Sequence, residues 1–202
     1  MASESSTPSI RASGQRAALP AVRWRQQGIA DWQPQAPVDL LFSNAALHWL
    51  PDHEALFGRL AACVAPGGTL AVQMPRNFLA PSHTRVADTV RAGPWRSRLE
   101  PMLGPPPVAE PDAYYGWLEP HAAELDIWET EYLQVLQGPD AVKEWTKGTW
   151  LKQFLDRLAD DAERAAFEAD YAARLRTDYP QRADGSTLFP FRRLFIVMKR
   201  RG

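Results

Sequence analysis

The chain has 202 residues, of which 45% are apolar and 23% are charged, and its formal net charge is −1. This length suits one folded domain with a hydrophobic core of its own. The balanced charge, without a long run of Lys or Arg, argues against nucleic acid as a partner, and no segment has the roughly 20 consecutive apolar residues of a membrane span.

The first residues of the chain give little structural signal. Residues 1–20 have no clear periodicity, and they lack the apolar stretch of a secretory signal. Cys63 is the only cysteine; it lies in an apolar run and is interpreted as a small buried residue, not a reactive thiol. Because one cysteine cannot form an internal disulfide, we expect the reducing cytoplasm as the compartment. We also expect a monomer.

The clearest elements are a strand, a helix and a second strand. Residues 38–44 form a nearly continuous apolar run, which is typical of a strand in a parallel sheet. Asp52 is placed to cap a helix whose apolar residues recur at helical spacing as far as Val64. A Pro-Gly-Gly turn at residues 66–68 is expected to lead into a strand over 69–74. This order predicts a right-handed βαβ unit with two parallel strands.

The middle of the chain has weaker patterns. A helix in two pieces is expected over residues 85–99. The five prolines from Pro101 to Pro111 predict an extended loop. A short helix is then expected over residues 114–125, followed by a strand over 126–136.

The last part of the chain is predicted to be helical until a final strand. Asp140 is expected to cap one helix, and a second helix is expected over residues 151–158. Between residues 160 and 179, large apolar side chains recur every fourth residue, which indicates an amphipathic helix with a solvated charged face. A buried strand is expected over residues 193–199.

Four strings of the sequence carry a resemblance to a known family. They read DLLFSNAALHWLPDH at residues 39–53, LAVQMPRN at 70–77, DIWET at 126–130 and RLFIV at 193–197. The central part of the first string is shared by many small-molecule methyltransferases, whereas the combination of all four is more specific. Over roughly residues 29–200 the chain resembles the trans-aconitate methyltransferases, a family of class I S-adenosylmethionine-dependent methyltransferases.

This resemblance implies an α/β fold with a Rossmann-like, doubly wound sheet of seven strands. The sheet would be mostly parallel, with an antiparallel C-terminal strand. The strands over 38–44 and 69–74 would be the fourth and fifth, and those over 126–136 and 193–199 the last two, paired antiparallel. The implied reaction transfers a methyl group from S-adenosylmethionine to a carboxylate of trans-aconitate, a small polycarboxylate, and gives the monomethyl ester.

The sequence departs from this family near its start. The family's first strand ends in an Asp-x-Gly-x-Gly-like loop, whose backbone approaches the cofactor closely because glycine has no side chain. No such string occurs here, so we expect the first strand and the glycine-rich loop to be missing. Residues 1–28 are interpreted as a remnant or scrambled part of the cofactor-binding half, from a mis-set gene start or frame errors. Residues 29–202 are interpreted as the methyltransferase core with substrate-shaping C-terminal helices.

The resemblance also implies a set of cofactor-binding residues. Glu4 would be a remnant of the acidic strand end that holds the ribose hydroxyls, and Ile29 lies in the segment that follows the third strand. Asn44 and Ala45 end a strand at the edge where ligands bind in open α/β sheets; a role for Asn44 in capping the next helix is the alternative. His48 completes the set, and a role as general base is disfavoured.

The substrate site is expected to clamp carboxylates, without a catalytic triad. A carboxylate is already an anionic nucleophile, so alignment and exclusion of water should supply most of the acceleration. We therefore expect no catalytic residue, and we find no metal-ligand spacing among His, Cys, Asp and Glu. The candidate substrate-binding residues are Trp49, Gln73, Arg76, Asn77, Tyr114, Tyr115, Lys147, Trp150 and Arg192.

Several of these candidates have alternative interpretations. Trp49 fits core packing as well as a pocket, and Arg76 fits a solvated loop. Tyr114 and Tyr115 are either a lid over the pocket or pins that hold a long loop. His83 is interpreted as a free surface histidine. The competing functions are a non-catalytic fragment that cannot hold the cofactor, and a methyltransferase for another small carboxylic acid.

Overall fold

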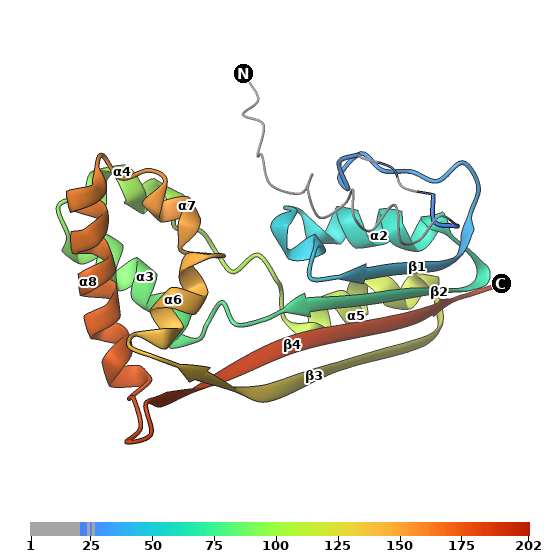
Figure 1. Ribbon diagram of the computed structural model, residues 1–202. Helices are drawn as coiled ribbons and strands as arrows, with labels where there is room; N and C mark the ends of the chain where they lie inside the picture. The colour runs from blue at the N-terminus through green and yellow to red at the C-terminus, as the bar shows by residue number, and fades with distance from the viewer. Residues whose placement is uncertain (1–20, 24, 26) are drawn as a thin grey trace. The chain divides into compact units, whose positions relative to one another are not determined.

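The computed structural model describes residues 21–23, 25 and 27–202 (Figure 1). The chain divides into two compact units, Met1–Gln33 and Pro34–Gly202. The proposed cofactor ligand Glu4 lies outside the described residues. In the first unit, the backbone N–H of Trp32 donates to the carbonyl of Ile29 at 3.2 Å, which forms a turn.

The second unit contains the predicted βαβ arrangement (Figure 1). Strands β1 (Val38–Asn44) and β2 (Val64–Pro75) pair in parallel, and helix α2 (His53–Cys63) connects them. The Asp52 side chain caps α2, as predicted, by accepting a hydrogen bond from the N–H of Ala55 at 3.2 Å. The apolar face of α2 is buried, in agreement with the helical spacing of its apolar residues.

Strand β2 begins at Val64, earlier than predicted, because the Pro-Gly-Gly segment belongs to the strand as an irregularity in its pairing with β1. Gly67 has a φ of 74°, in the left-handed region that glycine adopts without steric cost. A Cβ atom at Gly68 would lie 2.8 Å from the backbone oxygen of Asp39. Both glycines are therefore needed for the bend that brings β2 alongside β1.

Four strands form one sheet in the order β1-β2-β4-β3. Strand β4 (Ser186–Arg200) is antiparallel both to β2 and to β3 (Ala122–Gln137). Strands β1, β2 and β3 therefore run in one direction, and β4 runs in the other. This confirms a mostly parallel sheet with an antiparallel C-terminal strand. Of the seven strands that the resemblance implies, the described part of the chain contains four.

The boundary between the predicted helix over 114–125 and the strand after it was misplaced. Helix α5 (Pro111–Leu118) and the 3-10 turn η3 (Glu119–His121) are followed at once by β3. Pro120 explains the early end of the helix, because proline has no N–H to donate to the preceding turn. The strand therefore includes residues 122–125, whose composition suits either a helix or a strand.

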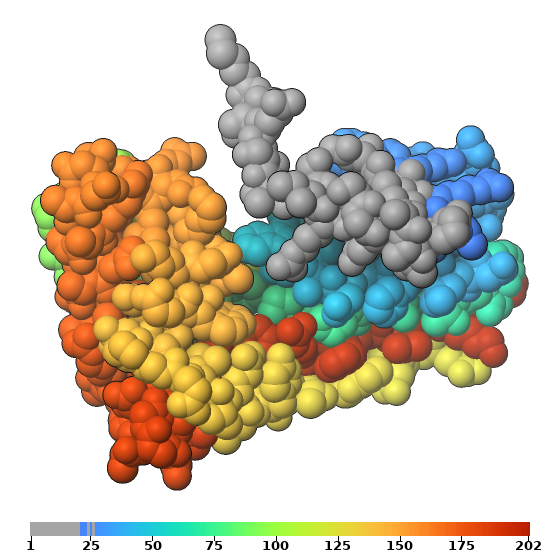
Figure 2. Space-filling view, viewed as in Figure 1, coloured from blue at the N-terminus to red at the C-terminus, as the bar shows by residue number. Residues whose placement is uncertain are grey.

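The remaining helices gather at one end of the sheet (Figure 1). They are α3 (Pro81–Ala92), α4 (Arg96–Leu99) with the 3-10 turn η2 (Glu100–Met102), α6 (Ala141–Lys147), α7 (Lys152–Leu155) and α8 (Asp161–Asp178). We call this group the helical cap; Figure 2 shows the side chains of its C-terminal helices packed into one continuous surface. Its core is rich in aromatic side chains, among them Phe154, Phe167 and Tyr171. In the described part of the chain, no helix is long and apolar enough to cross a membrane.

The N-termini of α8 and α6 are stabilised differently. Asp160 caps α8 by accepting from the N–H of Glu163 at 2.8 Å. Asp140, the predicted cap of α6, forms no such bond; its carboxylate accepts from Arg176 on α8 at 2.7 and 2.9 Å. That ion pair holds the pKa of Asp140 below its ordinary value. The local pattern around Asp140 does not reveal a partner 36 residues away.

Candidate active site

The carboxyl ends of β1 and β2 lie side by side, as predicted. Asn44, the last residue of β1, pairs in register with Gln73. The N–H of Ala45 donates to the backbone oxygen of Gln73 at 2.9 Å. Ala45 has a φ of 49°, so the chain turns sharply as it leaves the strand. Ligands bind at this edge in open α/β sheets.

A pocket of about 280 Å³ lies where the chain leaves these two strands. Five predicted site residues line it: Ala45, His48, Trp49, Asn77 and Trp150. The other lining residues are Pro75, Phe78, His83, Trp145, Thr149, Phe191 and Arg193. We call it the aromatic pocket, because most of these side chains are aromatic rings. Walls of this kind exclude water from a bound ligand.

Three rings from separate segments form one wall of the aromatic pocket. Phe78 packs edge-on against His83 and Trp150, with ring centroids 5.1 and 5.5 Å apart. His83 lies in the first turn of α3, and Trp150 follows α6. Burial lowers the pKa of His83 to about 4, so the ring is neutral at pH 7. The interpretation of His83 as a free surface histidine was therefore wrong.

The aromatic pocket and the residues behind it hold hydrogen-bond donors that lack acceptors. Asn77 Oδ1 accepts from the backbone N–H of Arg192 at 2.6 Å, and the buried Nδ2 has no partner among the described residues. Gln73 is arranged in the same way: Oε1 accepts from Arg193 Nη1 at 2.8 Å, and the buried Nε2 has no partner there. His48 Nδ1 is a further buried atom without a partner there, and in the neutral ring it is a donor or an acceptor according to the tautomer. Because an unpaired buried donor costs free energy, this set indicates a ligand rich in acceptors.

Arg193 brings a positive charge to the pocket wall. Its guanidinium lies 5.0 Å from the ring centroid of Phe191 and 5.7 Å from that of Tyr132. Its Nε donates to the hydroxyl of Tyr132 at 3.0 Å, and its Nη1 donates to Gln73. These partners are all neutral, and no carboxylate in the described part of the chain pairs with Arg193. The charge is therefore left for a ligand.

Arg76, in contrast, forms ion pairs with carboxylates of the protein itself. It donates to Glu110 at 3.0 and 2.6 Å and to Glu129 at 2.5 Å. Its side chain is only 11% exposed, and it does not line the aromatic pocket. We correct the predicted role accordingly: Arg76 ties the end of β2 to the loop before α5 and to β3.

Two more predicted clamps, Arg192 and Lys147, also lie outside the pocket lining. Arg192 pairs with Glu131 at 3.2 Å, and Lys147 pairs with Glu168 at 2.8 Å. Arg192 and Arg193 are neighbours on β4, so their side chains point to opposite faces of the sheet. The sequence analysis named Arg192 as the candidate, whereas Arg193 is the one that lines the pocket.

Tyr114 lies in the core, where it pins α5 to α2. Its side chain is fully buried. The hydroxyl accepts from the N–H of Ala109 at 3.2 Å and lies 2.5 Å from Nδ1 of His53. His53 Nε2 lies 3.1 Å from the carbonyl of Leu47 and donates to it, so Nδ1 accepts from the tyrosine. The pin interpretation holds for Tyr114, and Tyr115, which is 54% exposed, does not line the pocket either.

Replacing Tyr114 by phenylalanine is expected to lower the free energy of unfolding by about 1–3 kcal/mol. The change leaves the buried Nδ1 of His53 and the part-buried N–H of Ala109 without a partner. Urea unfolding followed by circular dichroism measures the loss. Tyr115→Phe is the matched control, because that side chain is exposed, and its effect should stay under about 0.5 kcal/mol. Equal losses in both variants would contradict the buried network.

Two pocket histidines make stability depend on pH. The pKa of both His48 and His83 is lowered to about 4, by burial for His83 and by burial together with the nearby His53 and Arg193 for His48. In the unfolded chain histidine titrates near its ordinary pKa of about 6.5. As the pH falls below that value, the unfolded state takes up protons that the folded state does not, so stability is lost between about pH 6.5 and pH 4.

We therefore expect the free energy of unfolding to fall by about 1–2 kcal/mol per histidine between pH 7 and pH 5. His83→Gln should show a smaller fall than the unmodified chain. Carboxylates with lowered pKa, such as Asp140 and Asp178, lose their contribution only below about pH 4, outside this window. Urea midpoints at both pH values measure the difference. A fall of the same size in His83→Gln would show that this histidine plays no part.

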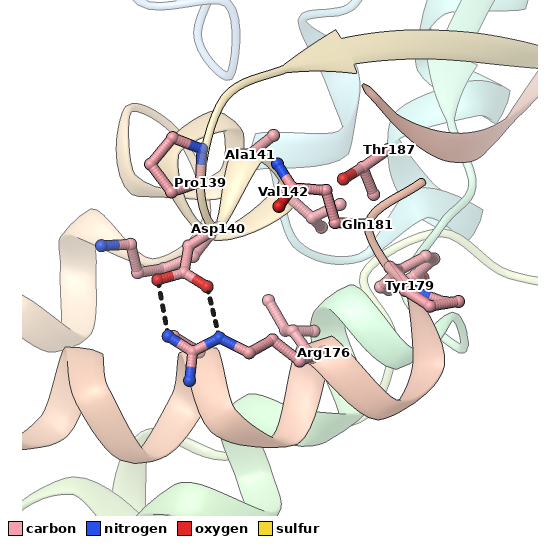
Figure 3. Close-up of a pocket in the computed structure, with 12 residues that line it drawn as sticks. Pro139, Asp140, Ala141, Val142, Arg176, Tyr179, Gln181 and Thr187 are labelled. Atoms are coloured by element: carbon pink, nitrogen blue, oxygen red, sulfur yellow. Dashed lines mark hydrogen bonds and ion pairs between the residues drawn. The ribbon is translucent and has the colours of Figure 1, made fainter. Parts of the chain in front are cut away.

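A second cavity, of about 290 Å³, lies between α6 and the end of α8 (Figure 3). Several of its polar groups have partners within the protein. Asp140 and Arg176 form the ion pair drawn in Figure 3, and Gln181 Nε2 donates to the carbonyls of Gly138 and Gly185, both at 3.0 Å. No described atom of its lining is a buried donor without an acceptor. The aromatic pocket is therefore the stronger candidate site.

The fold and the site together define a class of protein. A family model described as a methyltransferase domain matches residues 8–122. The structure is also similar to the crystal structure of the YcgJ protein from Bacillus subtilis, with a TM-score of 0.52, at 14% identity, covering 95% of this chain and 76% of that one. The pocket at the carboxyl ends of parallel strands fits the same class. The chain is a methyltransferase of the class I fold.

Curated relatives identify the family within this class. The chain is 46% identical to the trans-aconitate 2-methyltransferase of Azoarcus sp. (strain BH72), over 92% of this chain and 72% of the relative. It is 43% identical to the trans-aconitate 2-methyltransferase of Rhizobium etli, over 90% of this chain and 71% of the relative. The chain belongs to the trans-aconitate 2-methyltransferase family.

Proposed function

We propose that the chain transfers a methyl group from S-adenosylmethionine to a carboxylate of trans-aconitate in the aromatic pocket. The observation that supports this substrate is the set of unpaired donors described above. Arg193 has no carboxylate partner, and Asn77 Nδ2 has no acceptor, among the described residues. A compound with several carboxylates supplies the missing acceptors and balances the charge.

The residues of the pocket align the substrate and keep water away from it. When bound, S-adenosylmethionine supplies an electrophilic methyl group on a sulfonium. A substrate carboxylate is already an anionic nucleophile, so the residues of the pocket would only have to hold one of its oxygens in line with that methyl group. No proton moves, so the neutral His48 and His83 need not act as bases. The rings of Trp49 and Trp150 limit the access of water, which makes the fixed donors more effective.

We propose that Asn44, Ala45 and His48 hold the methionine end of the cofactor. Asn44 is exposed at the carboxyl end of β1, and Ala45 and His48, which follow it in the chain, line the aromatic pocket. These polar groups fit the amino and carboxylate groups of that end. The role proposed for Glu4, which lies outside the described residues, concerns the ribose, and Ile29 is proposed as a further cofactor-binding residue.

Two titrations and one turnover assay test the proposal. Isothermal titration of S-adenosylhomocysteine and, separately, of trans-aconitate should give saturable heats. Incubation with S-adenosylmethionine and trans-aconitate should give the monomethyl ester in mass spectrometry. Absence of heat with S-adenosylhomocysteine would favour a fragment without cofactor binding. Faster turnover of citrate, isocitrate or cis-aconitate would show that one of these acids, and not trans-aconitate, is the substrate.

The compartment and the oligomeric state are also proposals. Cys63, the single cysteine, supports the cytoplasm as compartment, and light scattering tests the proposed monomer.

A further inference from the structure

Arg193 is held in place by the two strands next to its own. Gln73 lies on β2 and Tyr132 on β3, and β4 runs between them. Gln73 accepts from Nη1 at 2.8 Å, and Tyr132 accepts from Nε at 3.0 Å. The ring of Phe191 supports the flat face of the guanidinium at 5.0 Å. The side chain is therefore fixed before any ligand arrives, so little rotamer entropy is lost on binding.

The orientation leaves donors available. A guanidinium has five N–H groups, and the Nη2 group of Arg193 has no partner among the described residues. A carboxylate can bind such an edge with two parallel hydrogen bonds. The guanidinium of Arg76 differs, because Glu110 and Glu129 already occupy it.

The charge of Arg193 acts on the pocket. It helps to lower the pKa of His48, although burial is the largest cause of that shift. A partly buried cation without a counter-ion is costly, and an anionic ligand removes that cost. The neighbouring histidines are neutral at pH 7, so they add no second charge to the pocket.

We infer that Arg193 determines specificity by binding a carboxylate of the substrate that is not methylated. This inference rests on the proposed function. The reason is chemical: two strong hydrogen bonds and a full positive charge withdraw electron density from a carboxylate and weaken it as a nucleophile. The reacting carboxylate must keep a free oxygen lone pair. A fixed guanidinium is therefore suited to a second carboxylate, and Gln73 and Tyr132 are its positioning residues.

The test compares Arg193→Gln with Arg192→Gln. Arg192 is the adjacent arginine on β4, outside the pocket lining and paired with Glu131, so its side chain is a matched control. The ligands are trans-aconitate, its chemically prepared monomethyl ester product and its trimethyl ester. Dissociation constants are read from quenching of tryptophan fluorescence, since Trp49, Trp145 and Trp150 line the pocket.

Arg193→Gln should weaken the binding of trans-aconitate about 10- to 100-fold. It should weaken the binding of the monomethyl ester by the same factor, because the carboxylate that Arg193 binds is still present in the product. Binding of the trimethyl ester should not change, and Arg193→Lys should restore part of the affinity. Arg192→Gln should bind all three compounds as the unmodified chain does.

Each other outcome has a separate meaning. A loss for trans-aconitate without a loss for the monomethyl ester would mean that Arg193 holds the reacting carboxylate, and the inference would be wrong. Unchanged affinities in Arg193→Gln would also overturn it. Equal losses for all three compounds would indicate a collapsed pocket and count against it. If the unmodified chain binds no trans-aconitate, the proposed function fails first.

Discussion

Replacement of Asn77 by aspartate is expected to weaken trans-aconitate binding about 100-fold or more. The two side chains have nearly the same shape. One aspartate oxygen can still accept from the backbone N–H of Arg192, the bond that ties the chain after β2 to β4 at 2.6 Å. The other oxygen replaces the unpartnered Nδ2, so a donor becomes an acceptor with a negative charge.

The size of this effect follows from Coulomb's law. Two like charges about 4 Å apart repel by about 4 kcal/mol at an effective dielectric constant of about 20, and each 1.4 kcal/mol is about tenfold in affinity. If the new carboxylate attracts Arg193 instead, that cation is lost to the substrate and affinity still falls. The fluorescence titration measures the dissociation constant. Gln137→Glu, an amide-to-acid change on the exposed end of β3, should leave it unchanged. If Asn77→Asp binds trans-aconitate with unaltered affinity, Asn77 is not part of the substrate site.

Replacement of Phe167 by alanine is expected to lower the free energy of unfolding by about 3–5 kcal/mol. Phe167 is fully buried in the core of the helical cap, and its ring packs edge-on against Trp95 at a centroid distance of 5.0 Å. Removing the ring leaves a cavity between α8 and the segment before α4. Neighbouring helices cannot fill such a cavity without losing their own contacts.

Phe42→Ala is the control for this prediction, because Phe42 on β1 is 69% exposed. The same atoms are removed, but little buried surface is lost, and the change should stay within about 1 kcal/mol. Urea unfolding monitored by circular dichroism compares the two variants. Similar losses in both would contradict the burial of Phe167. Because Trp150 packs on Phe154 of the same core, at 6.0 Å between centroids, Phe167→Ala should also loosen the pocket wall.

The βαβ unit was predictable because its signals are local. The cap at Asp52, the spacing of apolar residues in α2 and the apolar strands lie within a few residues of one another. Parallel pairing then follows from the connection itself, and it places Asn44 beside Gln73. The start of β3 was not predictable in this way, because Ala122–Leu125 suits either structure and only Pro120 indicates that the helix stops earlier.

The site was predictable in part, for the same physical reason. Residues at strand ends, such as Ala45 and Asn77, reach the pocket because parallel strands end at one edge of a sheet. The charged and aromatic candidates depend on partners far along the chain. Arg76 meets Glu129 across 53 residues, and Tyr114 meets His53 across 61. A single sequence does not show such pairs.

The choice between Arg192 and Arg193 depends on strand register. Neighbouring residues of a strand point to opposite faces of the sheet, but the sequence does not show which face meets the pocket. Phe191 lies two residues before Arg193 and shares its face; both line the pocket. An aromatic residue two positions away was therefore the one local signal that favoured Arg193.

The long-range contacts of β4 also set the order in which the molecule assembles. The bonds from Asn77 to Arg192 and from Gln73 to Arg193 span 115 and 120 residues, whereas each helix closes within its own segment. Closing such large loops is slow compared with helix formation. After dilution from denaturant, ellipticity should recover early, and the capacity to bind a tricarboxylate should return only with the last kinetic phase.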